Sequence, residues 1–309
     1  MPAIETNNLA KWFGDVAAVE TLSLRVEEGE VFGLVGPDGA GKTTTMRLLA
    51  SIMAPTSGTA SVAGFDIVRQ AELVKEHIGY MSQRFGLYTD LTVLENIHFY
   101  ADIYGVSRRE RKGRVERLLG FSGLTPFGDR LAGNLSGGMK QKLALACTLI
   151  HTPKVLLLDE PTNGVDPVSR RDFWRILYQM LREGVTIFVS TSYLDEAERC
   201  SRLALMHEGR LLAVGTPQEV KALMTQTILE VRTAGARAAA AVLTAALPGR
   251  RVSMFGDRVH VATSDATGDS EHIRTAMEQA GTPAASVEAI EPSLEDVFVS
   301  VVAGEKNVQ

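Results

Sequence analysis

The sequence is poor in cysteine, in net positive charge and in long apolar runs. Only Cys147 and Cys200 occur among 309 residues, too few for a disulfide framework, which favours a reducing cytosol. A formal net charge of -5 argues against a nucleic-acid partner, because nucleic-acid-binding domains are usually basic. No apolar run approaches the roughly 18 residues of a membrane span, and residues 1–9 lack a signal-peptide pattern. Any membrane-spanning component is therefore expected to be a separate chain.

The first two thirds of the chain alternate between short apolar runs and helical patterns, which is typical of α/β proteins. The apolar runs are nearly continuous, so we expect a mostly parallel sheet covered on both faces. Strands are expected at Ile4–Leu9, Leu22–Val26, Val31–Val35, Thr59–Ala63, His77–Met81, Val155–Asp159, Val185–Ser190 and Leu203–Met206. Helical patterns cover Thr43–Ser51, Ile67–Glu76, Leu91–Gly120, Ser136–Leu149, Pro167–Arg182 and Tyr193–Arg199.

The character of the sequence changes after Met224, where no catalytic cluster is recognisable. The segments Arg251–Phe255 and Arg258–Thr263 flank Gly256-Asp257, a suitable two-residue hairpin turn. Further strands and helices are expected around this hairpin, which together predict a small accessory α+β domain. We place the boundary near residues 222–228, giving domains of residues 1–225 and 226–309.

A glycine-rich segment follows the strand Val31–Val35 and opens the next helix. It fits the pattern G-x-x-x-x-G-K-[ST], and the strand, loop and helix order favours a phosphate site over a simple glycine turn. Glycines let backbone N–H groups surround a phosphate, a lysine adds positive charge, and a threonine hydroxyl suits Mg²⁺. The residues expected to bind the nucleotide are Gly36, Pro37, Asp38, Gly39, Ala40, Gly41, Lys42, Thr43 and Thr44.

Two acids end the apolar strand Val155–Asp159. Ligands of open α/β sheets collect at the carboxyl ends of the strands, where Asp159 is suited to hold a Mg²⁺-bound water. Glu160 follows and is suited to polarise a water for attack on the γ-phosphate. Two solvated acids at a strand end are the simpler alternative, which the neighbouring phosphate loop disfavours.

The segment Leu135–Gln141 places Ser136, Gly137 and Gly138 at the start of a helix. Unpaired N–H groups there can bind an anion, although Ser136 could also be a simple N-cap. Together with the phosphate loop and the acidic strand end, this segment resembles the signature loop of the nucleotide-binding subunits of ABC transporters. The resemblance runs in register over about residues 1–225. It implies a P-loop fold with a RecA-like core and a helical subdomain at about residues 84–150.

The resemblance also implies roles for individual residues. ATP and Mg²⁺ would be the ligands, with Phe13 (or Trp12) stacking on adenine and Thr43, Gln83 and Asp159 at the metal. Ser136, Gly137 and Gly138 would contact the γ-phosphate of ATP held by the opposite subunit, and Asn163–Asp166 would cross to that subunit. The segment Phe85–Thr92 would receive the coupling helix of the membrane partner.

Two positions depart from the pattern of the family. Asp38 stands in the phosphate loop where Asn or Ser is common, and Ser192 replaces the switch histidine that precedes Asp195-Glu196-Ala197. A serine hydroxyl is shorter than an imidazole and carries no positive charge. The sequence therefore predicts normal ATP binding but slowed hydrolysis, with Glu160 and Ser192 at the catalytic position. A nearby residue such as Tyr193 could substitute for the histidine.

The tail Pro292–Phe298 resembles the end of ABC-2 type exporter ATPases, including the daunorubicin-resistance kind. The resemblance implies an ATPase that dimerises with ATP, as a homodimer or a heterodimer, and energises a multi-span permease on a separate chain. Its expected place is the cytoplasmic face of the inner membrane, as a peripheral subunit. The alternative is a nucleotide-gated regulatory or scaffold subunit that hydrolyses ATP weakly because of Ser192.

Overall fold

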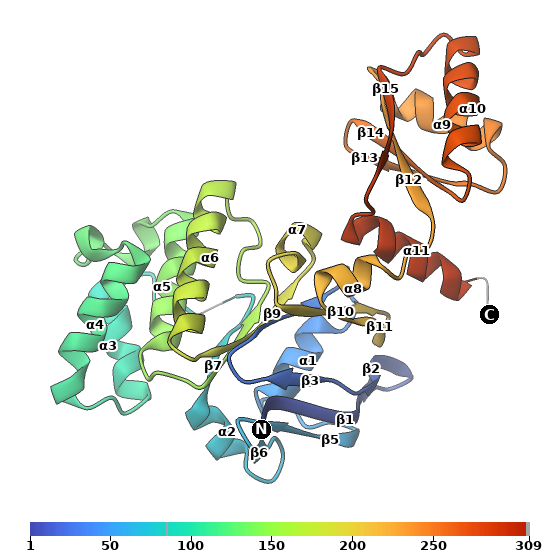
Figure 1. The fold of residues 1–309 in the computed structure, drawn as a ribbon. Coiled ribbons are helices and arrows are strands. Elements are labelled where there is room, and N and C mark those ends of the chain that lie inside the picture. Colours follow the sequence, from blue (N-terminus) through green and yellow to red (C-terminus); the bar gives the residue numbers. More distant parts are fainter. Residues whose placement is uncertain (85, 307–309) are drawn as a thin grey trace. The chain divides into compact units, whose positions relative to one another are not determined.

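The computed structural model describes residues 1–84 and 86–306, and the chain divides into two compact units, Met1–Pro217 and Gln218–Gln309. Phe85, the first residue of the segment expected to receive a coupling helix, lies outside the described residues. Figure 1 shows the chain as a ribbon.

The centre of the first unit is a six-stranded sheet in the order β11-β10-β4-β9-β8-β7. The strands β10, β4, β9, β8 and β7 run parallel, and β11 is an antiparallel edge strand that the sequence did not predict. Alternate side chains of β4 and β8 enter two separate cores, which explains why these strands are apolar throughout. The bounds are β4 Val31–Val35, β7 Ile78–Met81, β8 Val155–Asp159, β9 Thr186–Thr191, β10 Arg202–His207 and β11 Arg210–Gly215.

A second, antiparallel sheet packs on one side of this core. The expected strand Leu22–Val26 is wrong as a single element: Leu22 ends β2 and a separate β3 begins at Arg25. Leu22, Leu24 and Val26 are nevertheless all buried. The alternation of apolar and polar residues therefore predicted which side chains are buried, but not the break between the two strands. The elements here are β1 Pro2–Phe13, β2 Val16–Leu22, β3 Arg25–Glu27, α1 Lys42–Leu49, β5 Ser57–Val62, β6 Phe65–Asp66 and α2 Ala71–His77.

Helices cover the other face of the central sheet. The helical run expected over Leu91–Gly120 is divided into two helices, because Gly105 adopts a φ of 63° that ends the first one. Thr92 and Glu95 form a capping box at the start of α3. The helices are α3 Val93–Ile103, α4 Arg108–Ser122, α5 Gly137–Leu149, α6 Pro167–Arg182 and the short α7 Leu194–Ala197, with 3₁₀ turns at Thr125–Phe127 and Ala132–Asn134.

The second unit contains a four-stranded antiparallel sheet in the order β13-β14-β12-β15. The hairpin around Gly256-Asp257 is confirmed, with Gly256 at a φ of 60°. In the expected tail motif, Ser293 caps α11, because its hydroxyl accepts from the N–H of Asp296 and donates to the carboxylate of Asp296. That carboxylate also lies 2.8 Å from Nδ1 of His260, which attaches the helix to the sheet. The elements are α8 Pro217–Lys221 at the junction, β12 Thr227–Arg232, α9 Ala236–Ala246, β13 Arg251–Phe255, β14 Arg258–Thr263, α10 Ala266–Gln279, β15 Ser286–Ile290 and α11 Leu294–Lys306.

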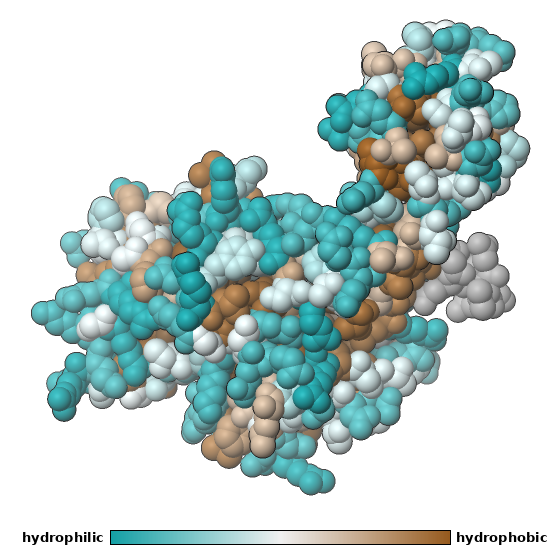
Figure 2. Space-filling model, viewed as in Figure 1, coloured by the Kyte–Doolittle hydropathy of each residue, from teal (hydrophilic) through white to brown (hydrophobic). Residues whose placement is uncertain are grey.

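Hydrophilic side chains cover much of the visible face of the first unit (Figure 2). Across residues 1–84 and 86–306, none of the helices has both the length and the apolar character needed to cross a membrane.

Candidate functional site

The glycine-rich loop lies between β4 and α1, and its glycines are required by close backbone contacts. A Cβ on Gly36 would lie 2.1 Å from the carbonyl oxygen of Met206, and one on Gly41 would lie 2.2 Å from that of Ala18. Gly41 also has a φ of 105° and gives α1 no side-chain cap. The first N–H groups of α1 are therefore available to an anion.

The loop lines a cavity of about 340 Å³. Gln83 and Glu160, from distant parts of the sequence, line it as well, so the fold brings together three of the predicted segments. The lining residues are Ala18, Asp38, Gly39, Ala40, Gly41, Lys42, Thr43, Thr44, Gln83 and Glu160.

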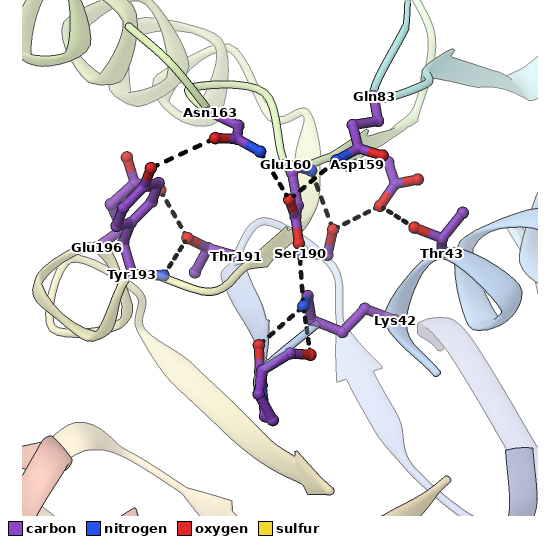
Figure 3. Close-up of polar contacts among 12 residues, drawn as sticks. Lys42, Thr43, Gln83, Asp159, Glu160, Asn163, Ser190, Thr191, Tyr193 and Glu196 are labelled. Atoms are coloured by element: carbon purple, nitrogen blue, oxygen red, sulfur yellow. Dashed lines mark hydrogen bonds and ion pairs between the residues drawn. The ribbon is translucent and has the colours of Figure 1, made fainter. Parts of the chain in front are cut away.

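Lys42 lies at the centre of this site and is almost fully buried. Its ammonium donates to the carbonyl oxygens of Gly36 (2.8 Å) and Pro37 (2.9 Å), and forms an ion pair with Oε1 of Glu160 at 2.9 Å (Figure 3). The ammonium has three donors, and these three contacts use them. The loop thus holds its cation against the carboxylate that the sequence singled out as catalytic.

Glu160 is held at both carboxylate oxygens. Its Oε2 accepts from Nε2 of Gln83 and from Nδ2 of Asn163, each at 3.2 Å, while Lys42 contacts Oε1. The residue has a φ of 48°, an uncommon conformation for glutamate, and its N–H donates to Oγ of Ser190 at 3.0 Å. Such strain is characteristic of functional sites, where the surrounding structure fixes the residue.

Asp159 ends β8 beside the loop threonine. Its Oδ1 accepts from the hydroxyl groups of Thr43 (3.1 Å) and Ser190 (2.8 Å). Its Oδ2 is buried and has no hydrogen-bond partner in the part of the chain that the structure describes. Burial raises the pKa of Asp159, against the lowering effect of the two hydroxyl hydrogen bonds. A buried oxygen without a partner suits an external cation or a water bound to it.

These donors fit Mg²⁺ shared with a nucleotide. Magnesium prefers oxygen ligands and is usually held by one or two protein groups together with waters and substrate phosphates. Thr43, Gln83 and Asp159 supply a hydroxyl, an amide and a carboxylate. Among the described residues no group of three His, Cys, Asp or Glu side chains forms an all-protein metal cage.

Ser190 was not singled out from the sequence, although it links both acids. It pairs with Asp159 in the parallel register of β8 and β9, so its hydroxyl reaches the carboxyl edge of the sheet beside Asp159 and Glu160. The sequence could have identified Ser190 as a polar residue near the carboxyl end of the strand expected at Val185–Ser190, where ligands of open α/β sheets collect.

Phe13 does not line this cavity. It is 49% exposed and Trp12 is 42% exposed, so neither ring is buried in the core. The ammonium of Lys11 lies 5.3 Å from the ring centre of Phe13. Which of the two rings stacks on adenine stays a prediction.

Ser136, Gly137 and Gly138 also lie outside the lining of the cavity. Ser136 is the N-cap of α5, and its hydroxyl accepts from the N–H of Met139 at 3.3 Å. Within one chain, Ser136 therefore acts as the simple N-cap that the sequence also allowed. A Cβ on Gly138 would lie 2.4 Å from Cβ of Ser169 in α6, whereas one on Gly137 would meet nothing within 4 Å. Gly138 is therefore needed for helix packing, and Ser136 and Gly137 remain exposed.

The two residues that depart from the family pattern are both exposed. Asp38 lines the cavity, and its carboxylate makes no hydrogen bond to the described residues, including those of the loop. The hydroxyl of Ser192 likewise has no hydrogen-bond partner in residues 1–84 and 86–306. The next residue, Tyr193, does have one: its hydroxyl lies 3.3 Å from Oδ1 of Asn163.

Comparison with known proteins places this site in a family. Residues 19–163 match the ABC transporter family, and residues 215–302 match the C-terminal domain of DrrA1-3-like ATP-binding proteins. The chain is 34% identical over 312 residues to the daunorubicin resistance ATP-binding protein DrrA3 of Streptomyces coeruleorubidus, covering 99% of this chain and 98% of that protein. The chain belongs to the ATP-binding proteins of ABC transporters. The predicted family and fold class, a P-loop α/β cassette with an accessory α+β domain, are confirmed.

One relative is about twice as long as this chain, and one solved structure of a related cassette is a dimer with bound nucleotide. The whole chain is 46% identical over 310 residues to the probable multidrug ABC transporter ATP-binding protein YbhF of Escherichia coli (strain K12), a match that covers 97% of this chain and 52% of YbhF. The chain therefore spans about half the length of that relative. The dimeric post-hydrolysis structure of the ATP-binding cassette MJ0796, bound to ADP and Pi, aligns with a TM-score of 0.63 at 26% identity, covering 69% of this chain and 98% of that chain.

Proposed function

We propose that the chain binds and hydrolyses MgATP and, through ATP-dependent dimerisation, energises an ABC-2 type exporter. We base this on one arrangement above all: Lys42, Thr43, Gln83, Asp159 and Glu160 converge on the glycine loop. In this proposal residues 1–225 form the cassette and residues 226–309 form an accessory domain that regulates it or supports the dimer.

Lys42 and Glu160 change partners when phosphate arrives. Lys42 exchanges the carboxylate of Glu160 for phosphate oxygens, because the loop N–H groups and its ammonium face the same cavity. Glu160 is then free to accept a proton from the attacking water, while Gln83 and Asn163 keep its carboxylate oriented. Mg²⁺, which Thr43, Gln83 and Asp159 would hold, neutralises phosphate charge when bound.

A second subunit completes the site in this proposal. Ser136 and Gly137 are exposed and do not line the cavity of their own chain, so their backbone N–H groups can face a nucleotide held by another copy or by a related subunit. Asn163–Asp166 would lie at the same interface. The dimeric relative bound to ADP and Pi supports this arrangement.

The named relatives support export as the process that is driven. DrrA3 is named for daunorubicin resistance and YbhF as a probable multidrug transporter protein. We propose drugs, lipids or polysaccharide-like molecules as cargo, a separate multi-span permease as partner, and a peripheral position on the cytoplasmic face of the inner membrane. The segment from Gly86 to Thr92 would receive the permease.

Affinity purification of the tagged full chain from detergent-solubilised membranes tests this function. We expect a multi-span protein to co-purify in a fixed ratio, together with ATPase activity. The matched control is the Glu160→Gln variant, which should recover the same partner without the activity. Recovery of wild-type chain from the membrane fraction with no multi-span partner would contradict the proposal.

The same purification distinguishes the alternative, a regulatory subunit with weak hydrolysis. The exposed hydroxyl of Ser192 supports this alternative, because it contacts neither Glu160 nor the loop. A complex that contains this chain and a different ABC subunit would favour it. Two copies of this chain with ATPase activity would favour the first proposal.

A further inference from the structure

The catalytic carboxylate is connected to a tyrosine that follows the missing switch histidine. The hydroxyl of Tyr193 donates to Oδ1 of Asn163 at 3.3 Å, and Nδ2 of Asn163 donates to Oε2 of Glu160 at 3.2 Å (Figure 3). A carboxylate can only accept hydrogen bonds, so the NH₂ group of Asn163 must face Glu160. Its carbonyl oxygen then faces Tyr193, whose hydroxyl is a suitable donor. The orientation of one amide is thus fixed from both ends.

Tyr193 is itself held in place from the protein interior. Its N–H donates to the hydroxyl of Thr191 at 3.0 Å, and its ring lies 4.2 Å from the guanidinium carbon of Arg170. Arg170 forms an ion pair with Glu196 at 3.4 Å, and Glu196 is fully buried. Glu196 also accepts a hydrogen bond from Thr191 at 2.9 Å. The ring therefore packs against Arg170, which is itself paired with the buried Glu196. This support gives the hydroxyl of Tyr193 a defined direction.

We propose that Tyr193 is a positioning residue for ATP hydrolysis, acting through Asn163 on the carboxylate of Glu160. This rests on the proposed function, since Glu160 must be the group that accepts the proton of water. Lys42 leaves Oε1 of Glu160 when phosphate binds. Of the side-chain contacts to Glu160 in the described residues, those of Gln83 and Asn163 with Oε2 then remain to orient the carboxylate. Because this chain has Ser192 in place of the histidine, the hydrogen bonds from Tyr193 through Asn163 orient the Glu160 carboxylate, which the serine does not contact.

The test compares steady-state phosphate release by the purified full chain with that of its Tyr193→Phe variant. The substitution removes only the hydroxyl and keeps the ring over Arg170. We expect kcat to fall roughly threefold to tenfold, the change that one hydrogen bond of ordinary strength produces. The KM for ATP and the melting temperature should stay at their wild-type values, because neither the loop nor the core is altered.

Tyr178→Phe is the matched control. The hydroxyl of Tyr178 donates to the carbonyl oxygen of Arg199 at 3.0 Å and has no link to Glu160. This variant should leave kcat unchanged. A second arm places Tyr193→Phe in an Asn163→Ala background, where we expect no further loss, because the pathway to Glu160 is already broken.

The outcomes separate the inference from the function on which it rests. A wild-type rate equal to that of Glu160→Gln would overturn both. A wild-type rate above that of Glu160→Gln, with kcat unchanged in Tyr193→Phe, would overturn the inference alone. The same holds if Tyr193→Phe lowers kcat equally with and without Asn163, or lowers it together with the melting temperature.

Discussion

Replacing Glu160 by glutamine is expected to lower ATP hydrolysis by about 10² to 10⁴-fold, the range attributed to a positioned general base. A carboxamide cannot accept the proton of water, yet it preserves the shape of the side chain and can still accept from Lys42. Binding should not suffer, because Lys42 no longer has to leave a buried anion when phosphate arrives. Steady-state phosphate release and equilibrium ATP binding, measured on the same preparation, check both expectations.

The control for Glu160→Gln is Glu72→Gln. Glu72 is a surface acid whose side chain is 82% exposed and pairs with Lys75 on α2. Its loss should change neither turnover nor ATP affinity. A Glu160→Gln variant that keeps more than about a tenth of the wild-type rate would rule out Glu160 as the general base.

Replacing Lys42 by alanine is expected to weaken ATP binding by about tenfold to a hundredfold, the worth of a charge-assisted hydrogen bond in a buried site. The variant also leaves the carboxylate of Glu160 buried without its cation, so the free energy of unfolding should fall as well. Equilibrium titration with ATP measures the first effect, and thermal unfolding without nucleotide measures the second.

The double variant Lys42→Ala with Glu160→Gln separates these two effects. A neutral carboxamide needs no cation, so much of the lost stability should return, whereas ATP affinity should stay low. Lys75→Ala, which removes an exposed ammonium, is the control for charge. If the double variant binds ATP as tightly as wild type, Lys42 does not act on phosphate.

The phosphate loop and the acidic strand end could be predicted because short-range patterns determine them. The bounds of β4, β8 and α6 agree with the apolar runs and the helical period of the sequence. Parallel strands place their carboxyl ends at one edge, so Asp159 and the loop were expected to meet, as they do through Thr43.

Other features depend on contacts that no sequence pattern records. Lys42 pairs with Glu160, and Asn163 links Glu160 to Tyr193, only because the central sheet brings three loops together. The exposure of Phe13 was likewise not predictable from its sequence surroundings, because its place near the end of a hairpin decides whether a ring is covered. The break within Leu91–Gly120 required the positive φ of Gly105, which a helical period alone does not indicate.

The central claim is that ATP occupies the glycine loop and takes Lys42 from Glu160. A crystal structure of the full chain with Mg²⁺ and a non-hydrolysable ATP analogue tests it most directly. The expected result is a triphosphate in the cavity lined by Asp38–Thr44, with the ammonium of Lys42 on phosphate oxygens and no longer 2.9 Å from Oε1 of Glu160. An intact ion pair between Lys42 and Glu160, with the analogue bound elsewhere, would contradict the claim.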